Sequence, residues 1–518
     1  MHNTGHLNSL KPDLIEKITL INTKKVSKVG QSMHTAVSLS QNNSINYNKS
    51  FNFWIEAYGC SANFSDMEMI SGTLQQKGFN LVTKPELADI NLIVTCSVKS
   101  STEHKMINRI KSLGKMDKPL VIAGCLPAAD ERMVKFLSPE ASLIGPDSIQ
   151  SITEVTYSAL KSQRMTKLSR TNQEKINLPK VRLNPIISII QISTGCLSEC
   201  TFCQTKLAKG NLKSFRIGKI INQINSDIEL GSKEIWLTST DNGCYGLDIG
   251  TNIVNLLRRC EQLDRYFKIR LGMLNPMYLK NLNDDICSIY STSNKLFKFI
   301  HIPIQSGSES VLRKMKRGHT INSLMELIDI LKSNIPDITI ATDIITGFPT
   351  ETDEDFEDTL KVIRNIEPDI VNSSKFSSRP GTLASKMVKV KDKTISKRSE
   401  MLHKLIKTIA FKNSSKWKGW KGEILLDDIE NGLLKGRNDY YKSIALTEDP
   451  HNVLYDNLGK QKKNNHRELH TDRKNSHGDL IYKRNLLFNN PLIGKRIIVK
   501  VFSNSNHTLN AIPLEIVE

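Results

Sequence analysis

Residues 193–203 read Ser-Thr-Gly-Cys-Leu-Ser-Glu-Cys-Thr-Phe-Cys, which places Cys196, Cys200 and Cys203 in one short loop. A cubane iron–sulfur cluster normally takes four cysteine thiolates. Three thiolates from one loop can hold three irons and leave the fourth open, as catalytic metal sites do. The alternatives are three buried structural cysteines or a zinc knuckle, but zinc usually takes four ligands and this loop offers no fourth. The spacing therefore predicts a catalytic 4Fe–4S cluster.

The C-x3-C-x2-C spacing, with Phe202 before the last cysteine, resembles the radical S-adenosylmethionine (SAM) superfamily. The resemblance implies that SAM chelates the open iron through its amino and carboxylate groups. An electron from the cluster then breaks a carbon–sulfur bond of SAM and releases a 5′-deoxyadenosyl radical. This chemistry implies a low-potential electron donor, such as a ferredoxin or a flavodoxin.

Composition narrows the class of protein. The 518 residues suffice for roughly two to four domains. A hydrophobic fraction of 39% and a charged fraction of 24% are typical of globular proteins, and no apolar run predicts a membrane span. The nine cysteines are sparse and odd in number, which favours metal ligation in a reducing, cytoplasmic compartment. The net charge of +19 favours a nucleic acid as partner, unless it reflects only a compositional bias.

The N-terminal part predicts a parallel α/β domain. Residues 1–50 are polar and weakly periodic, which predicts a flexible tail. Strands then alternate with helices. The expected strands are 53–57, 88–95 and 119–123, and the expected helices are 65–78 and 102–113.

A cysteine follows each of these three strands, namely Cys60, Cys96 and Cys125. Parallel strands end at the same edge of a sheet, where ligands bind, so the three thiols can converge. This arrangement suits a second cluster with an open iron. The alternative is that each is an ordinary buried cysteine.

The polar residues 151–180 are expected to connect two domains. Six further strand candidates then alternate with helices and predict an open, partial (β/α)6 barrel with the first cysteine loop at its mouth. These candidates are 186–192, 234–238, 268–271, 299–304, 338–342 and 370–376.

The C-terminal part changes to β character. A connecting helix is expected at 388–416, followed by a small closed barrel. Its expected strands are 423–426, 440–446 and 496–502. The run at 448–484 is rich in Lys, Asn and His and predicts an exposed, mobile insertion.

Six motifs in this order resemble the methylthiotransferase family. They are YGC-x2-N-x2-D-x-E at 58–68, TCSVK at 95–99, AGCLP at 123–127, HIPIQSGS at 301–308 with GFPTET at 347–352, and RPGT at 379–382. The resemblance covers almost everything from Phe51 onward. The loop residues Thr205 and Lys206 and the segment 236–246 resemble the archaeal and eukaryotic branch, whereas bacterial branches usually carry a proline where Lys206 stands. No apolar tail anchor follows the barrel, which favours an archaeal-type enzyme.

The resemblance implies the domains and the reaction. The implied domains are an auxiliary-cluster domain at 51–160, a radical SAM domain at 181–415 and an RNA-binding TRAM barrel at 416–518. Cys60, Cys96 and Cys125 would hold an auxiliary 4Fe–4S cluster that carries the sulfur. The implied substrate is N6-threonylcarbamoyladenosine at position 37, in the anticodon stem-loop of tRNAs that read ANN codons. Two SAM molecules would be used per turnover, one for the methyl group and one for the radical.

Three other functions remain as alternatives. The enzyme could act on isopentenyladenosine at position 37 of tRNA or on a ribosomal-protein aspartate. A non-enzymatic alternative is an RNA-binding iron–sulfur sensor. The positive charge speaks against the ribosomal substrate, and the complete barrel signatures speak against the sensor.

Further residues are candidates for binding. Phe202 is expected to border the adenine of SAM. Ser239 and Asp241, after the second barrel strand, either bind polar groups of SAM or cap the strand end. Arg379 contacts cofactor or tRNA, or forms a structural salt bridge. Cys244, Cys260, Cys287 and His301 are expected to be structural.

For RNA, Lys435 and Arg437 are the preferred candidates. Cations interleaved with aromatic residues suit phosphate contact and base stacking. The neighbouring aromatic residues are Trp417, Trp420, Tyr440 and Tyr441. The alternative is that solvated loops surround aromatic residues of the barrel core.

Overall fold

The computed structural model describes residues 50–97, 100–171, 174–448, 450 and 480–517. The predicted tail, apart from Ser50, and most of the predicted insertion therefore lie outside the described residues. Among the described helices, none is long and apolar enough to cross a membrane.

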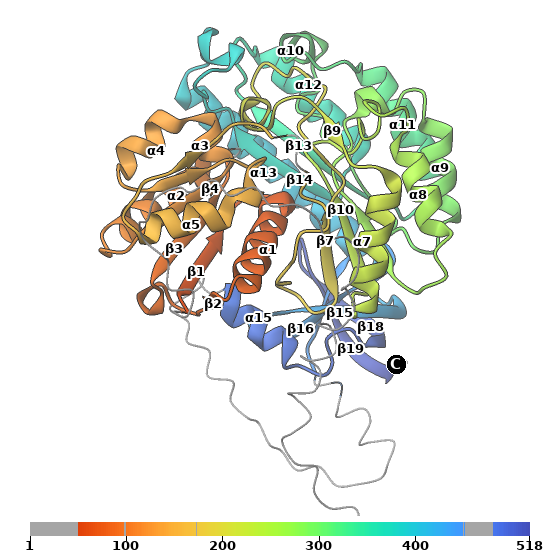
Figure 1. Ribbon diagram of the computed structural model, residues 1–518. Helices are drawn as coiled ribbons and strands as arrows, with labels where there is room; N and C mark the ends of the chain where they lie inside the picture. The colour runs from red at the N-terminus through yellow and green to blue at the C-terminus, as the bar shows by residue number, and fades with distance from the viewer. Residues whose placement is uncertain (1–49, 98–99, 172–173, 449, 451–479, 518) are drawn as a thin grey trace, which may run out of the picture. The chain divides into compact units, whose positions relative to one another are not determined.

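The N-terminal part is a parallel six-stranded sheet in the order β2-β1-β3-β4-β5-β6 (Figure 1). Its central strand β3 is buried at every residue, as expected of a parallel strand covered on both faces. The strands are β1 (Asn52–Ala57), β2 (Asn80–Leu81), β3 (Ile90–Thr95), β4 (Leu120–Gly124), β5 (Ser142–Ile144) and β6 (Thr166–Lys167). The helices are α1 (Ser61–Gln76), α2 (Ser100–Gly114), α3 (Cys125–Ala129), α4 (Glu131–Leu137) and α5 (Ile152–Leu160). The predicted parallel α/β fold is confirmed.

Part of the predicted connecting region, residues 151–180, packs with the N-terminal sheet, and its first helix lies within the N-terminal domain predicted to end at residue 160. Helix α5 buries Ile152, Val155 and Ala159 against the sheet, at the spacing of one helical face. Strand β6 then pairs in parallel with β5 and extends the sheet. Two-residue strands carry too little periodicity to be recognised in the sequence.

The middle part is the predicted partial barrel of six parallel strands. The sheets β11-β10-β7 and β12-β13-β14 are joined by backbone hydrogen bonds from Phe297 to Ile269 (3.0 Å) and from Leu274 to His301 (2.8 Å). The strands are β7 (Ile187–Gln191), β10 (Glu234–Thr238), β11 (Lys268–Leu271), β12 (Phe299–His301), β13 (Thr339–Thr346) and β14 (Ile370–Lys375), with the short pair β8 (Ser193–Thr194) and β9 (Lys213–Ser214) in the cysteine loop. The helices are α6 (Gln204–Lys209), α7 (Ile217–Glu229), α8 (Ile253–Glu261), α9 (Asn283–Thr292), α10 (Glu309–Lys314), α11 (Ile321–Asn334) and α12 (Asp353–Ile366).

Helix α13 (Asp392–Ser415) leads to a closed five-stranded barrel in the order β15-β16-β17-β19-β18. Its strands are β15 (Lys421–Glu430), β16 (Leu433–Arg437), β17 (Ser443–Leu446), β18 (Arg496–Asn504) and β19 (Leu509–Ile516). The predicted closed barrel is confirmed, and β16 and β19 are additions to the predicted strands. The expected strand at 440–446 begins only at Ser443, because Tyr441 lies in a turn with φ of +60°.

The end of the predicted insertion is ordered, which corrects the boundary at residue 484. Residues 480–484 form the start of helix α15 (Leu480–Phe488). Ile481 is 5% exposed and packs in the core beneath the N-terminal sheet. This apolar contact holds the helix in place.

Helix α1 joins the N-terminal sheet to the barrel and lies between β1 and β7 (Figure 1). The Asp66 carboxylate on this helix accepts hydrogen bonds from Gln191 of β7 (2.6 Å) and from Lys175 (2.8 Å). Glu68 accepts a hydrogen bond from the backbone of Leu183 at 2.9 Å. The acidic residues of the YGC-x2-N-x2-D-x-E motif thus fix the N-terminal domain to the first strand of the barrel.

Candidate active site

The cysteine loop at the mouth of the barrel folds back on itself. Gly195 has a φ of +68°, and a Cβ there would lie 1.9 Å from the carbonyl oxygen of Asn211, so only glycine fits. The backbone of Cys196 donates to Gly210 at 3.1 Å, and the Lys206 ammonium donates to the Cys196 carbonyl at 2.5 Å. These contacts set the position of the first cysteine before any metal binds.

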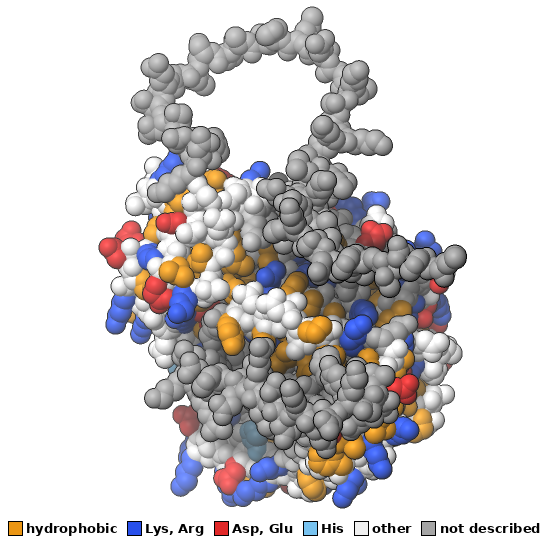
Figure 2. Space-filling model, turned by 90° about the horizontal axis from the view of Figure 1, so that it is seen from below, with side chains coloured by type: hydrophobic (Ala, Val, Ile, Leu, Met, Phe, Trp, Pro, Cys, Tyr) orange, Lys and Arg blue, Asp and Glu red, His pale blue; other side chains and the backbone are white. Residues whose placement is uncertain are grey.

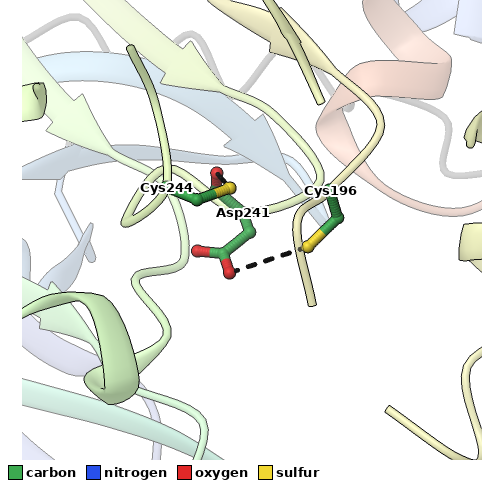
Figure 3. A group of neighbouring side chains, drawn as sticks. All are labelled: Cys196, Asp241 and Cys244. Carbon is green, nitrogen blue, oxygen red and sulfur yellow. Dashed lines mark hydrogen bonds between the residues drawn. The ribbon is translucent and has the colours of Figure 1, made fainter. Parts of the chain in front are cut away.

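Cys196 lies against two side chains from the loop that follows β10 (Figure 3). Its Sγ is 3.9 Å from Oδ2 of Asp241, while the thiol of Cys244 donates to the Asp241 carbonyl at 3.3 Å. Oδ1 of Asp241 accepts from the backbones of Gly243 (2.9 Å) and Asn275 (3.1 Å). A hydrogen bond with Cys244 lowers the pKa of Cys196, which favours the thiolate that binds iron.

Cys200 has a cationic neighbour that the sequence analysis missed. Nη1 of Arg317 donates to the Cys200 sulfur at 3.5 Å, and Nη2 donates to the Pro303 carbonyl at 3.0 Å. Arg317 is buried, and its Nε has no hydrogen-bond partner among the described residues. The guanidinium places a positive charge next to the Cys200 sulfur, so the donor set fits an anionic cluster. Arg317 lies 117 positions after Cys200 in the sequence, so only its basic charge could have suggested that it contacts a cysteine.

The second set of cysteines gathers at one edge of the N-terminal sheet. Cys60 precedes α1, Cys96 follows β3, and Cys125 begins α3 directly after β4. Cys96 and Cys125 are buried, while Cys60 is exposed. Burial, opposed by the nearby Lys209 and assisted by Cys96 and Cys60, raises the pKa of the Cys125 thiol to about 12. The structure thus brings the three thiols together, and their role as cluster ligands stays a prediction.

Two glycines allow this convergence. Gly59 has a φ of +109°, and a Cβ there would lie 2.5 Å from the Cβ and 2.8 Å from the Sγ of Cys96. Gly124 has a φ of +96°, and a Cβ there would lie 2.5 Å from the carbonyl oxygen of Thr95. Asn63 ties the same loops together by donating to the carbonyls of Tyr58 (2.6 Å) and Thr95 (3.0 Å). These glycines therefore allow the loops that carry the three cysteines to approach one another closely.

Gly59→Ala is therefore expected to prevent assembly of the auxiliary cluster, because its Cβ displaces Cys96. Anaerobically reconstituted protein should contain about half the iron of the wild type, since only the cluster of the barrel loads. Gly78→Ala is the matched control: Gly78 also has a positive φ, of +84°, but a Cβ there meets nothing within 4 Å. The control should lose about 1 kcal/mol of stability and no iron. Full iron content in Gly59→Ala would contradict the prediction.

Comparison with known proteins agrees with this geometry. Residues 190–363 match the radical SAM superfamily, and residues 52–145 match a family described as uncharacterized protein family UPF0004. A probable threonylcarbamoyladenosine tRNA methylthiotransferase of Pyrococcus abyssi is 35% identical over 402 residues, covering 76% of this chain and 93% of that protein. The threonylcarbamoyladenosine tRNA methylthiotransferase of Homo sapiens is 35% identical over 407 residues, covering 77% of this chain and 69% of that protein.

The chain belongs to the radical SAM methylthiotransferase family. The predicted archaeal and eukaryotic branch is confirmed, because the relatives come from both groups. Membership of the radical SAM superfamily implies a 4Fe–4S cluster and SAM as cofactors.

The candidate SAM-binding residues of this family member occupy different environments. Phe202 packs against Phe348, with ring centroids 6.5 Å apart, beside the cysteine loop. Ser239 donates to Asn242 at 2.7 Å, as in the strand-end alternative. Asp241 caps the same turn with Oδ1, yet its Oδ2 faces Cys196. Contact of these residues with SAM stays a prediction.

The candidate RNA-binding cations are already paired. Lys435 forms an ion pair with Glu430. Arg437 pairs with Asp427 at 3.1 Å and lies over the ring of Tyr441, 4.2 Å from its centroid. On the face shown in Figure 2, Lys and Arg side chains are spread among acidic and apolar ones. An RNA role for Lys435 and Arg437 stays a prediction, and it would require RNA to compete with these carboxylates.

The remaining candidates make contacts within the protein, and contact of Arg379 with cofactor or tRNA stays a prediction. Arg379 pairs with Glu103 of α2, which is the salt-bridge alternative. Cys260 and Cys287 are buried outside both cysteine sites. His301 forms a hydrogen bond with Asp343 at 3.1 Å. Trp417, Trp420 and Tyr440 pack in the core of the C-terminal barrel.

Proposed function

We propose that this chain methylthiolates C2 of N6-threonylcarbamoyladenosine at position 37 of tRNA, giving the 2-methylthio nucleoside. One observation carries the proposal: the helices that begin at or directly after a cysteine of each predicted site pack against each other. Helix α6, which begins directly after Cys203, packs against α3, which begins at Cys125. The relatives at about 35% identity carry the name of this activity, which supports the choice of substrate.

The reaction requires both sites. The C2–H bond of adenine is unactivated, so acid–base chemistry cannot replace its hydrogen, and a radical-generating cofactor is needed. Cys196, Cys200 and Cys203 would hold the cluster that cleaves SAM. Cys60, Cys96 and Cys125 would hold the auxiliary cluster, which supplies the sulfur.

The protein's own residues would prepare the radical site. Arg317 donates a hydrogen bond to the Cys200 sulfur, and Lys206 fixes the backbone of Cys196. Because Asp241 is 2% exposed, the loop that carries it excludes water from one side of Cys196. Exclusion of water protects a reactive radical from side reactions.

The tRNA partner fits the charge of the chain. A net charge of +19 attracts a polyanion. Position 37 lies in the anticodon loop, where single-stranded bases can be turned outward and read. We infer that the C-terminal barrel contributes to tRNA binding and that a ferredoxin or a flavodoxin delivers the electron.

The test is nucleoside mass spectrometry of tRNA from cells with and without this gene. We expect 2-methylthio-N6-threonylcarbamoyladenosine to disappear on deletion, to return with the wild-type gene and to stay absent with Cys200→Ala. The unmethylthiolated nucleoside should accumulate in its place. An unchanged level on deletion would refute the substrate, and a change in the isopentenyladenosine derivative instead would identify the other tRNA substrate.

A further inference from the structure

Lys209 is a largely buried cation with no hydrogen bond or ion pair of its own among the described residues. It ends helix α6, directly after the radical cysteine loop, and it is 4% exposed. No hydrogen bond or ion pair links its ammonium to any residue that the structure describes. An unpaired buried charge destabilises a fold, so such a lysine is expected where it binds something.

Lys175 shows what a paired lysine looks like at the same depth. It is 3% exposed, and its ammonium donates to Asp66 at 2.8 Å and to the Pro146 carbonyl at 3.2 Å. A lysine as deeply buried as Lys209 can therefore find hydrogen-bond partners in this fold. Burial alone does not explain why Lys209 has no hydrogen bond.

The surroundings of Lys209 identify the site to which it belongs. The ionisable groups that interact with its charge are Cys125, Cys60, Asp66 and Asp147. Asp66 is already paired with Lys175. Cys125 and Cys60 are two of the three thiols at the edge of the N-terminal sheet, and α3 and α6 pack together there. The barrel thus contributes one positive charge to a site whose cysteines all come from the N-terminal domain.

We propose that the Lys209 ammonium binds the anionic sulfur, hydrosulfide or methanethiolate, that the auxiliary site holds for transfer. This inference rests on the proposed function and adds the group that recognises the sulfur. A lysine ammonium is a compact point charge with three donors, which suits a small monovalent anion. Three thiolates around an iron cluster repel a further anion, and a buried cation offsets that repulsion.

The test is binding of sodium hydrosulfide to the anaerobically reconstituted, dithionite-reduced full chain, followed by electron paramagnetic resonance. The signal of the auxiliary cluster is the one that is present in the wild type and absent from Cys125→Ala. Lys209→Gln should weaken the apparent affinity for hydrosulfide about tenfold, because it keeps the side-chain length without the charge. Lys209→Arg should bind like the wild type, because it keeps the charge. Equal affinity in Lys209→Gln and the wild type would overturn the inference.

Stability of the apoprotein separates this role from a structural one. Without cluster or sulfur, Lys209→Met should unfold at a temperature no lower than the wild type, because it removes an unpaired buried charge. A clearly lower unfolding temperature would show a structural role and overturn the inference. If Lys209→Gln loses the auxiliary cluster and Lys209→Arg keeps it, the result supports a requirement for the positive charge. If both variants lose the auxiliary cluster, the inference is overturned.

The outcome for the wild type distinguishes this inference from the proposed function. If the wild-type chain holds no second cluster and has the iron content of Cys125→Ala, the proposed function fails and this inference fails with it. If the second cluster forms and Lys209→Gln binds hydrosulfide normally, only the inference fails.

Discussion

Cys125→Ala is expected to abolish methylthio transfer while SAM cleavage continues. Cys125 begins α3 in the N-terminal domain, and it takes no part in the contacts that hold the radical loop. Its loss leaves two thiols at the auxiliary site, too few to hold a cluster with one open iron. The methylthio nucleoside should fall by on the order of 100-fold or more, as for the loss of a metal ligand.

Cys200→Ala should give the opposite pattern, with both 5′-deoxyadenosine and the methylthio nucleoside lost. The measurement is anaerobic turnover with dithionite as reductant, with both products quantified by chromatography and mass spectrometry. Cys287→Ala is the matched control, because Cys287 is as buried as Cys96 but lies outside both sites. It should form both products. Methylthio transfer by Cys125→Ala at the wild-type rate would remove the auxiliary site from the mechanism.

The places of the cysteines in the fold, and the fold itself, could be predicted because both depend on local sequence patterns. The spacing within one loop predicts that Cys196, Cys200 and Cys203 bind one cluster. The rule that parallel strands end at one edge brings Cys60 and Cys96 together from different parts of the sequence. Strands β16 and β19 were not predicted, because barrel strands with one exposed face give a weaker signal than buried ones.

The neighbours of the cysteines were not predictable, because they come from distant segments. Arg317 contacts Cys200 across 117 positions in the sequence. Lys209 is next to the radical loop in sequence, but its charge interacts with the other site. Neither contact leaves a periodic pattern or a fixed spacing. Only the tertiary structure shows them.

The C-terminal barrel shows how one pattern can have two meanings. Interleaved cations and aromatic residues are typical of RNA-binding surfaces and also of buried interfaces. Here Tyr441 is 8% exposed and packs against Phe297 and Phe299 of the radical SAM barrel. Arg437 lies over this ring and pairs with Asp427. At Arg437 and Tyr441 the pattern therefore reflects contact between the C-terminal barrel and the radical SAM barrel.

Lys175→Met is expected to cause the largest loss of stability among the substitutions considered, about 3–5 kcal/mol. Its ammonium and Gln191 both bind Oδ1 of Asp66, which is 1% exposed, and Oδ2 has no partner among the described residues. Removing the lysine leaves a buried carboxylate without a directly paired cation where α1 meets β7. Urea unfolding of the apoprotein measures the effect.

Two further variants separate the buried charge from the loss of the side chain. Lys175→Met combined with Asp66→Asn should recover most of the stability, because the buried carboxylate that lost its partner is then neutral. Lys219→Met breaks an exposed pair with Glu174 and should cost about 0–1 kcal/mol. If Lys175→Met costs no more than Lys219→Met, the buried pair does not stabilise the contact between α1 and β7. The two cysteine sites must then be held in place by other contacts, such as the packing of α3 against α6.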